Sequence, residues 1–577
     1  MPFKVQHPTP EIKEKRSFVP TDVEILTWDS IARFFDDLAQ RELETEKQLV
    51  QWLIDRSELT AVLEENLAWR YIRMNCDTSN DAYAEAFEQF VKDIQPRILL
   101  ASNELDKKFY HCKAKDELDA EYYGILIRVL NNRMELFREE NVPLISELQV
   151  KEQEYGKVSS QMTVSHDGKQ LTLQQASNFL KDTDRRVRET FFNKINSRRL
   201  DDARTLQELL SSLLSIRHAV AQNAGFPNYF EFKWKELGRF DYGIQDILEF
   251  HEAIELKARP LVDQIHLQRK ESLGLDSLRP YDLEVDPELK PPLKPFQAVD
   301  ELVDKTIASF TAIRPRFGTF LREMKKGGFL DLDSRIGKAP GGFNYPLYES
   351  NIPFIYMNAT GNLRDLETMF HEGGHAIHSF LSAHHKFIEF KELPSEVAEL
   401  ASMTMELISM DQWHHFFTSE DDLKRAMRSQ LEGVVQVLPW IATVDAFQYW
   451  LYHHLDHGFD ERNRSWLEVM HRFGSTHVDW SGLEKYAHHL WQKQLHIFEV
   501  PLYYIEYGIA QLGAIALWKN YRESPATALD AFEKALSLGY SKPIPEIYKV
   551  AGIEFKFSLT YVGELMDFVH QELQKLK

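Results

Sequence analysis

The chain has 577 residues, of which 43% are hydrophobic, 27% charged and 12% aromatic, and its formal net charge is −21. These proportions exclude a largely disordered chain, and the negative charge argues against nucleic-acid or anionic-membrane binding, which needs a basic surface. No signal-peptide pattern and no run of about 18 apolar residues occur. We therefore expect a cytoplasmic protein that binds neither nucleic acid nor membrane.

The predicted elements are mostly helices, which begin in the N-terminal part of the chain. Apolar residues recur at three- and four-residue intervals from Thr21 to about Phe137, which predicts several long amphipathic helices. The two cysteines, Cys76 and Cys112, form no CxxC pair and are predicted to be buried thiols. No low-complexity tract divides the chain, so we expect one large, lobed structure.

The periodicity changes around residue 160. Alternating residues flank Asp167 and Gly168, a dipeptide suited to a two-residue hairpin turn, and helical periodicity then continues to about Lys270. The proline-rich segment 278–296 is predicted to be an extended connector, because residues before proline avoid helical conformations. A glycine-rich stretch follows, and the apolar run 352–358 within it predicts a strand of a short mixed sheet.

The next helix, predicted from Leu363 to Leu381, contains the pattern HEGGH. An apolar stripe (Leu366, Phe370, Gly373, Ile377, Leu381) faces a core, while His371 and His375 fall about 40° apart on another sector. Two neutral imidazoles so placed can bind one zinc ion, and Glu372 lies where it can take a proton from a water molecule beside the metal. Gly373 and Gly374 each cost about 1 kcal/mol in a helix, so we expect a crossing element or the substrate backbone beside them, and a larger loss of activity than of stability on substitution by alanine.

A metal site of this kind needs a third protein ligand. A second helix is predicted to begin near Ser395, and three of its acids, Glu396, Glu399 and Glu406, are possible ligands. Val397, Leu400, Ala401 and Thr404 make its apolar face. An acid that borders this face near the helix start is best placed to point inward, which favours Glu399, with Glu396 as the alternative.

Other polar residues near this motif and elsewhere also need an interpretation. His378 shares the metal-facing sector and is predicted to support a ligand. Glu367, one turn before His371, is predicted to be an exposed helix acid, with orientation of that ring as the alternative. His453 and His457 repeat the four-residue spacing, but no glutamate follows His453 and no second carboxylate-bearing helix follows. We therefore interpret that pair as structural.

The segments "MFHEGGHAIHSF" and "ELPSEVAEL" resemble the zinc oligopeptidases of the thimet oligopeptidase and oligoendopeptidase F family, and are most similar to oligoendopeptidase F. The resemblance implies a mainly α, large lobed helical zincin-type metallopeptidase with a small β-sheet beside the HExxH helix and a deep substrate channel. It implies one zinc ion per chain, bound by His371, His375 and Glu399. It also implies two regions: a helical N-terminal region over residues 1–200, ending in the hairpin and a helix, and a catalytic region over residues 201–577.

The resemblance extends to "HIFEVPLYYIEYGIAQLG" near the C-terminus. It implies that His496 and Tyr507, with Tyr503 or Tyr504, hold the substrate and stabilise the tetrahedral intermediate. Tyr503 and Tyr507 stand four residues apart, so both hydroxyls can reach one cleft.

We therefore predict a zinc metalloendopeptidase that hydrolyses short peptides, with Glu372 as the general base. Residues 352–361 are predicted to offer an edge strand to which an extended peptide adds. The alternatives are a carboxypeptidase or dipeptidyl carboxypeptidase of similar fold, which needs a cation to hold the substrate's C-terminal carboxylate, and a non-catalytic helical scaffold that binds peptides.

Overall fold

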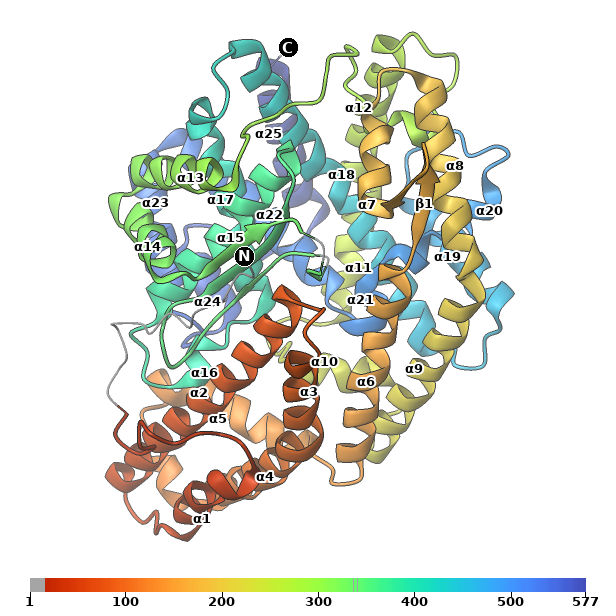
Figure 1. Cartoon of the computed structure of the whole chain (residues 1–577). Coiled ribbons are helices and arrows are strands. Elements are labelled where there is room, and N and C mark those ends of the chain that lie inside the picture. Colours follow the sequence, from red (N-terminus) through yellow and green to blue (C-terminus); the bar gives the residue numbers. More distant parts are fainter. Residues whose placement is uncertain (1–15, 336, 340, 577) are drawn as a thin grey trace.

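The computed structural model describes residues 16–335, 337–339 and 341–576, and within them the chain is mainly helical with two small sheets (Figure 1). The predicted mainly α fold with a small sheet before the HExxH helix is confirmed. Residues 1–15, where the sequence shows no signal-peptide pattern, lie outside the described residues. No helix of the described residues is long and apolar enough to cross a membrane, and the cytoplasmic location stays a prediction.

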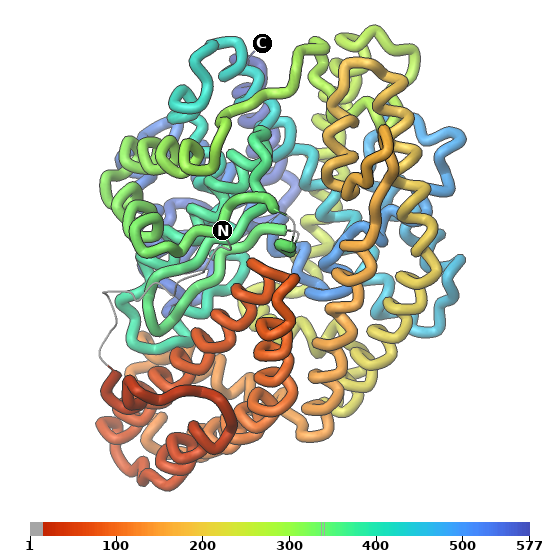
Figure 2. Tube along the Cα trace, viewed as in Figure 1, coloured from red at the N-terminus to blue at the C-terminus, as the bar shows by residue number. Residues whose placement is uncertain are grey.

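The N-terminal helices enclose a hydrophobic core of their own. They are α1 (Ala32–Gln40), α2 (Glu46–Cys76), α3 (Asp81–Gln89), α4 (Gln95–His111) and α5 (Ala120–Leu136). Phe387, Phe390 and Tyr540, from much later in the chain, complete this core. The red and orange segment at the lower left of Figure 2 is thus joined to the rest of the molecule by apolar packing.

A second core joins the middle of the chain to a later segment. Its elements are α6 (Asn141–Ser160), α7 (Leu173–Ser177), α9 (Ala203–Asn223), α10 (Tyr229–Glu236), the end of α18 (Glu420–His453), α19 (Phe459–Phe473) and α21 (Leu495–Glu499). Two smaller clusters beside it hold β1 (Thr163–His166), β2 (Lys169–Thr172), α8 (Arg185–Asp201) and α20 (Glu484–Ala487). Side chains from residues 136–237 and 444–502 share this core, so the ochre and blue segments lie side by side in Figure 2.

The predicted hairpin is present. Strands β1 and β2 pair antiparallel, with His166 opposite Lys169. Asp167 and Gly168 have φ angles of 48° and 75°, the two positive values that a type I′ turn requires. Asp167 and Gly168 therefore form the two-residue turn that the sequence predicted.

The proline-rich connector follows α11 (Ile244–Ala253) and α12 (Arg259–Ser272) and crosses the top of the molecule in Figure 1. It contains a short 3₁₀ turn at Pro280–Asp282 and a second turn closed by the hydrogen bond from the Leu289 N–H to the Asp286 carbonyl, so it is only partly extended. Asp282 is fully buried and accepts hydrogen bonds from Arg185 and Arg188 of α8. These charge-assisted bonds anchor the connector at one point.

The largest core surrounds the three-stranded sheet. Its elements are α13 (Val299–Ile313), α14 (Pro315–Gly327), β3 (Leu330–Asp333), β4 (Phe343–Tyr345), β5 (Phe354–Ala359), α15 (Leu363–Ser382), α17 (Ser395–Ser409), α18 (Glu420–His453), α22 (Tyr504–Glu523), α23 (Pro525–Ser537), α24 (Ile544–Val550) and α25 (Leu559–Lys575). The short helix α16 (Ile388–Lys391) packs into the N-terminal core through Phe390. The sheet is mixed, as predicted, because β3 pairs parallel and β4 antiparallel with β5.

The prediction that residues 352–361 offer a free edge is wrong. β5 is the central strand, in the order β3-β5-β4, so partners cover both of its edges. Ile355 donates its main-chain N–H to Phe329 on the β3 side, so Asn344, which lies opposite Ile355 on β4, directs its own main-chain groups away from β5. The edge nearest the HExxH helix therefore belongs to β4, because the Asn344 side chain reaches the carbonyl of Glu372.

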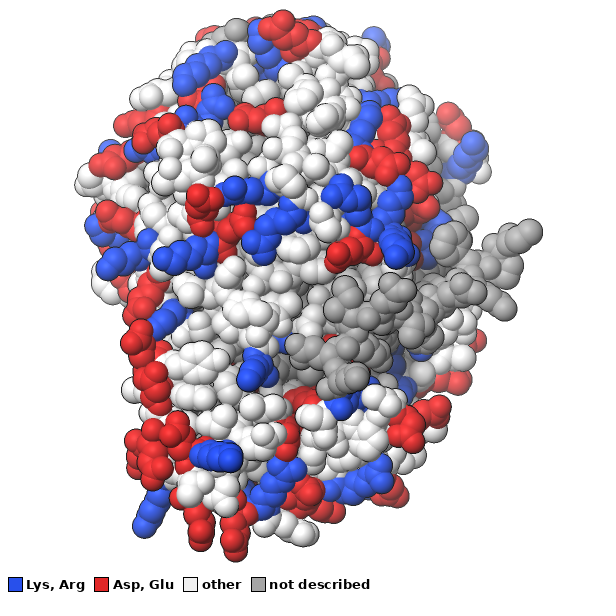
Figure 3. All heavy atoms as spheres, turned by 90° about the vertical axis from the view of Figure 1, so that its left-hand side faces the viewer, with Lys and Arg blue, Asp and Glu red and all other residues white. Residues whose placement is uncertain are grey.

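Two further expectations concern buried and surface groups. Cys76 and Cys112 are buried free thiols, as predicted. On the face in Figure 3, acidic and basic side chains are interspersed, so the charge of −21 does not give this face one uniform sign. The division of the chain near residue 200 stays a prediction.

Candidate metal centre

Helix α15, which carries the HExxH pattern, has a well-capped N-terminus. Asn362 caps the helix by accepting from the main-chain N–H of Asp365, and the Asp365 carboxylate accepts in return from the main chain of Thr360, Gly361 and Asn362. The predicted apolar stripe is buried, with Leu366 and Phe370 fully enclosed. The opposite sector of the helix is thereby directed toward α17 and α22.

The two glycines allow other elements to approach α15 closely. A Cβ atom on Gly374 would lie 2.6 Å from Cα of Ser402 in α17, and one on Gly373 would lie 2.6 Å from the ring of Phe310 in α13. The predicted crossing element is therefore α17, whose backbone lies against Gly374. This contact brings the first turns of α17 within reach of the α15 histidines.

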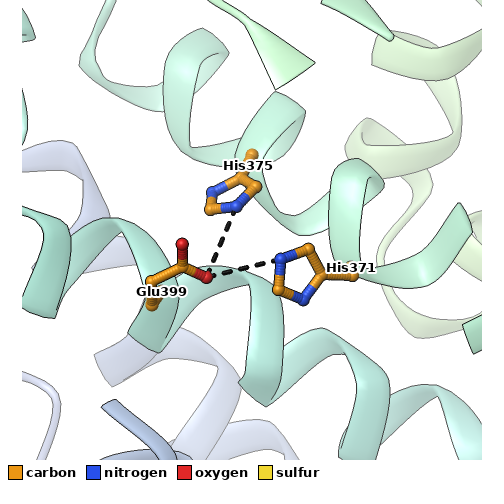
Figure 4. A group of neighbouring side chains, drawn as sticks. All are labelled: His371, His375 and Glu399. Carbon is orange, nitrogen blue, oxygen red and sulfur yellow. Dashed lines mark ion pairs between the residues drawn. The ribbon is translucent and has the colours of Figure 1, made fainter. Parts of the chain in front are cut away.

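His371, His375 and Glu399 converge on one point, as Figure 4 shows. Nε2 of His371 lies 3.3 Å and Nε2 of His375 lies 3.6 Å from the same oxygen, Oε2 of Glu399. Ligands bound to zinc at about 2.1 Å with tetrahedral angles lie about 3.4 Å apart. The donor set and its spacing fit a zinc ion, and the two imidazoles are 21% and 16% exposed, which leaves one side open to solvent.

Glu406, a possible ligand from the sequence, instead supports one. Its Oε1 accepts from Nδ1–H of His371 at 2.7 Å, and its Oε2 accepts from Nε2 of Gln430 at 2.8 Å. A carboxylate at Nδ1 fixes the tautomer that leaves Nε2 free for a metal. Gln430 comes from α18, so no local spacing in the sequence indicated it.

The alternative ligand Glu396 and the supporting residue His378 lie outside this arrangement. The Glu396 carboxylate accepts from the hydroxyl of Tyr242 and faces away from the histidines. His378 is fully buried, and neither of its ring nitrogens has a hydrogen-bond partner in the described part of the chain. The structure therefore brings Glu399, and neither of these two residues, to the metal site.

The remaining histidines and acids singled out by the sequence are also apart from the site. The predicted exposure of Glu367 is wrong, because this residue is buried, and it pairs with Arg364 rather than orienting His371. Nδ1 of His453 donates to the carbonyl of Tyr449, while Nε2 of His457 accepts from Arg462. His453 and His457 thus have separate structural partners.

Glu372 lies directly beside the metal ligands and is buried. Burial raises the pKa of Glu372 to about 7, and the charge of His371 opposes this effect. A carboxylate with such a pKa is a stronger base than one in water. The side chain of Asn344 donates to the main-chain carbonyl of the same residue, which ties β4 to this point of α15.

The C-terminal tyrosines have different partners. The Tyr503 hydroxyl donates to Oε1 of Glu399 at 2.9 Å, and Tyr507 lies beside Tyr503 with ring centroids 5.1 Å apart. Burial and then the charge of Glu399 raise the pKa of both phenols, which keeps them protonated donors. The Tyr504 hydroxyl does not face the metal ligands but donates to Oε1 of Gln494.

Gln494 controls the orientation of His496, and the sequence analysis missed it. Its Oε1 accepts from both Tyr504 and Nε1 of Trp440, so its amide NH₂ must face Nδ1 of His496, at 2.8 Å. Burial lowers the pKa of His496 to about 4. The neutral ring therefore carries its proton on Nε2, which donates to the Tyr507 oxygen at 3.3 Å and leaves the Tyr507 O–H free to donate elsewhere.

A buried arginine holds the turn before α22. Arg239, in the loop before α11, donates to the carbonyl of Leu502 and to Oε1 of Glu506 at 2.8 Å. Leu502 has a positive φ of 66°, an uncommon conformation for leucine. These bonds fix the turn from which Tyr503 reaches Glu399, and Arg239 was also missed because it lies far from α22 in the chain.

A mainly helical fold that brings two histidines and a glutamate from crossing helices together defines a protein with a candidate metal centre. The Peptidase family M3 model matches residues 178–566, and the Peptidase M3 N-terminal domain matches residues 18–137. This chain therefore belongs to Peptidase family M3.

Two curated relatives are similar over part of their length. The oligoendopeptidase F homolog of Borreliella burgdorferi is 21% identical over 65% of this chain and 63% of its own length. Oligopeptidase PepF of Bacillus subtilis is 22% identical over 56% of this chain and 48% of its own length. The match thus spans 48% to 63% of the length of these two relatives.

Two solved structures are similar over almost the whole chain. PZ peptidase A with inhibitor 2 aligns with a TM-score of 0.91 and 23% identity, over 97% of this chain and 99% of that one. Oligoendopeptidase-F from Enterococcus faecium aligns with a TM-score of 0.62 and 16% identity, over 95% and 98%. These likenesses establish the fold.

Proposed function

We propose that this chain is a zinc-dependent endopeptidase that hydrolyses oligopeptides. The observation that carries the proposal is the convergence of His371, His375 and Glu399 at zinc-ligand spacing, with Glu372 buried beside them. Membership of Peptidase family M3 supports peptide hydrolysis as the reaction. The names of the oligoendopeptidase F relatives support oligopeptides as the substrates.

The chemistry divides between the metal and the protein. Zinc held by the three ligands would supply Lewis acidity, which lowers the pKa of water and polarises a carbonyl group. Glu372 accepts the proton of the attacking water and delivers it to the amine that leaves. Its raised pKa suits both steps, because the group must gain and then lose a proton near neutral pH.

The C-terminal residues stabilise the oxyanion in this proposal. The Tyr507 oxygen accepts a hydrogen bond from Nε2–H of His496, so the Tyr507 O–H is free to donate to the developing negative charge. Tyr503 holds Glu399 in place through its hydroxyl and is the second tyrosine at the site. Tyr504 acts through Gln494, which fixes the tautomer of His496.

An extended substrate adds to the outer edge of β4, which pairs with no other strand among the described residues. Asn344 offers a main-chain N–H and C=O at that edge, and its side chain lies on the carbonyl of Glu372. A peptide paired there passes directly beside the catalytic glutamate.

Two measurements test the proposal. Purified protein should contain about one zinc per chain, and Glu372→Gln should retain the zinc while hydrolysis falls by roughly a thousandfold or more. An exposed glutamate, Glu420, offers the control Glu420→Gln, which should leave both properties unchanged. Equal hydrolysis by Glu372→Gln and wild-type protein would overturn the mechanism.

The products separate the proposal from its alternatives. A peptide blocked at both ends should be cut at an internal bond, as mass spectrometry of the fragments would reveal. Cleavage that occurs only with a free C-terminus, one or two residues from that end, would instead indicate a carboxypeptidase or dipeptidyl carboxypeptidase. Binding without cleavage of any peptide would indicate a scaffold.

A further inference from the structure

Helix α21 has one buried side and one open side. Successive helical residues are about 100° apart around the axis, so the buried residues 497–498 lie together on one side of this helix. On the opposite side Leu495, Glu499 and His496 fall within about 100° of one another, and all three are exposed or half-buried. Because Nε2 of His496 donates to the Tyr507 oxygen, the open side of α21 borders the proposed oxyanion residues.

The carboxylate in the middle of this open side, that of Glu499, has no hydrogen-bond or ion-pair partner in the part of the chain that the structure describes. A Cβ atom built on Gly156 of α6 would lie 3.8 Å from its Oε1, so the carboxylate lies against α6, the neighbour of α21 in Figure 1. Glu152 of α6 has its charge balanced by Arg217 at 2.9 Å. Burial, and then the charge of Glu152, raises the pKa of Glu499 to about 7, which is the effect expected for a partly buried carboxylate that lacks a cation.

The side chains on either side of Glu499 are apolar and open to solvent. Leu495, one helical turn before Glu499, is 39% exposed, and Val500, the next residue, is 42% exposed. A lysine or arginine side chain combines an apolar stem with a charged head, and it covers apolar surface with the stem while the head pairs with an acid. An unpartnered carboxylate between two open apolar side chains matches both parts of such a group.

We propose that Glu499 binds the side chain of a lysine or arginine of the peptide substrate, whose stem lies against Leu495 and Val500. The ammonium or guanidinium group donates charge-assisted hydrogen bonds to the carboxylate. The inference rests on the proposed peptidase function and adds to it a class of substrate, namely peptides with a basic residue close to the bond that is cut.

The distance from His496 gives the position of this basic residue. Glu499 follows His496 by three residues, which is about 4.5 Å along a helix, and His496 contacts Tyr507, the proposed donor to the reacting carbonyl group. An extended peptide covers about 3.3 Å per residue. The basic residue should therefore lie within about two residues of the bond that is cut.

The experiment compares lysine with norleucine, which keeps the apolar stem and lacks the charge. Peptides acetylated at the N-terminus and amidated at the C-terminus carry one or the other residue at a single position on either side of the cut. For wild-type protein, kcat/KM should be about tenfold higher for lysine at one position within about two residues of the cut. In Glu499→Gln, which keeps the shape of the side chain, this ratio should fall toward one. Glu468→Gln, at an exposed acid of α19, is the matched control and should keep the wild-type ratio.

A peptide with a free N-terminus tests the other source of an ammonium group. If the free α-amino group raises kcat/KM more than lysine does, and Glu499→Gln removes that gain, the carboxylate binds the end of the peptide and the side-chain assignment is wrong. Titration calorimetry with Glu372→Gln measures binding without turnover. Lysine should bind more tightly than norleucine there, and adding Glu499→Gln to this variant should remove the difference.

The proposed function and the basic-residue subsite fail separately. If wild-type protein hydrolyses none of the peptides, the proposed function is wrong. If it hydrolyses lysine and norleucine peptides equally well at every position, or if Glu499→Gln keeps the wild-type ratio, the peptidase function stands and the subsite is wrong.

Discussion

The carboxylate of Glu406 lies 2.7 Å from Nδ1 of His371. Nε2 of the same ring lies 3.3 Å from Glu399. One imidazole is therefore held between a carboxylate that orients it and the point at which a metal would bind. Gln430 in turn donates to Glu406, so three helices, α15, α17 and α18, set the direction of one ligand.

Removing the charge of Glu406 should weaken zinc binding. We expect Glu406→Gln to raise the Kd for zinc by about 10- to 100-fold, because the amide orients His371 less well and brings an NH₂ group toward the donor of Gln430. Competition with a chromophoric chelator measures this Kd. An unchanged Kd would mean that Glu406 only fills space, and Glu420→Gln should behave as wild type.

The hydrogen-bond chain from Gln494 through His496 to Tyr507 predicts that substitutions along it lower turnover by different amounts. Tyr507→Phe removes the proposed oxyanion donor and should lower kcat by about 100-fold. Gln494→Leu leaves Tyr507 in place but no longer fixes which ring nitrogen of His496 carries the proton, so we expect kcat to fall by about tenfold. Tyr504→Phe should cost less than either, since Trp440 still holds the Gln494 amide.

The kcat values of the three variants are compared with one another, so each variant is a control for the other two. Stopped-flow or steady-state hydrolysis of one fluorogenic peptide gives each kcat. A loss in Tyr504→Phe as large as that in Tyr507→Phe would contradict the assignment of Tyr504 to a supporting position.

Adding a methyl group at Gly374 should destabilise the protein. The new Cβ would meet the backbone of α17 at 2.6 Å, and overpacking of this kind costs about 1–3 kcal/mol, against about 1 kcal/mol gained in helix propensity. Because α17 carries Glu399, Gly374→Ala should also weaken zinc binding. This contact favours a packing role for the glycine over the substrate-facing role that the sequence left open.

Thermal unfolding monitored by circular dichroism tests this prediction. Gly433 in α18 is the matched control, since nothing lies within 4 Å of a Cβ built there. Gly433→Ala should raise the melting temperature and Gly374→Ala should lower it. A rise in both variants would show that Gly374 is not needed for the close contact with α17.

The sequence by itself determined those features that depend on neighbours along the chain. Helical periodicity, the Asp167-Gly168 turn and the stripe that buries one side of α15 are local, so residue type and spacing were enough to predict them. The pairing of His371 with His375 belongs to the same class, since one helical turn joins them.

The tertiary structure decided everything that joins distant segments. Tyr503 reaches Glu399 across 104 positions, and Asn344 reaches Glu372 only because β5 takes the centre of the sheet and β4 its edge. Glu396, Glu399 and Glu406 lie on one helix, yet only Glu399 brings an oxygen to the point where His371 and His375 meet, whereas Glu406 accepts from the other nitrogen of His371. The physical reason is that the close contact of α17 with Gly374 fixes both the rotation and the position of that helix, and such a contact between backbones depends on packing rather than on the order of residues in either segment.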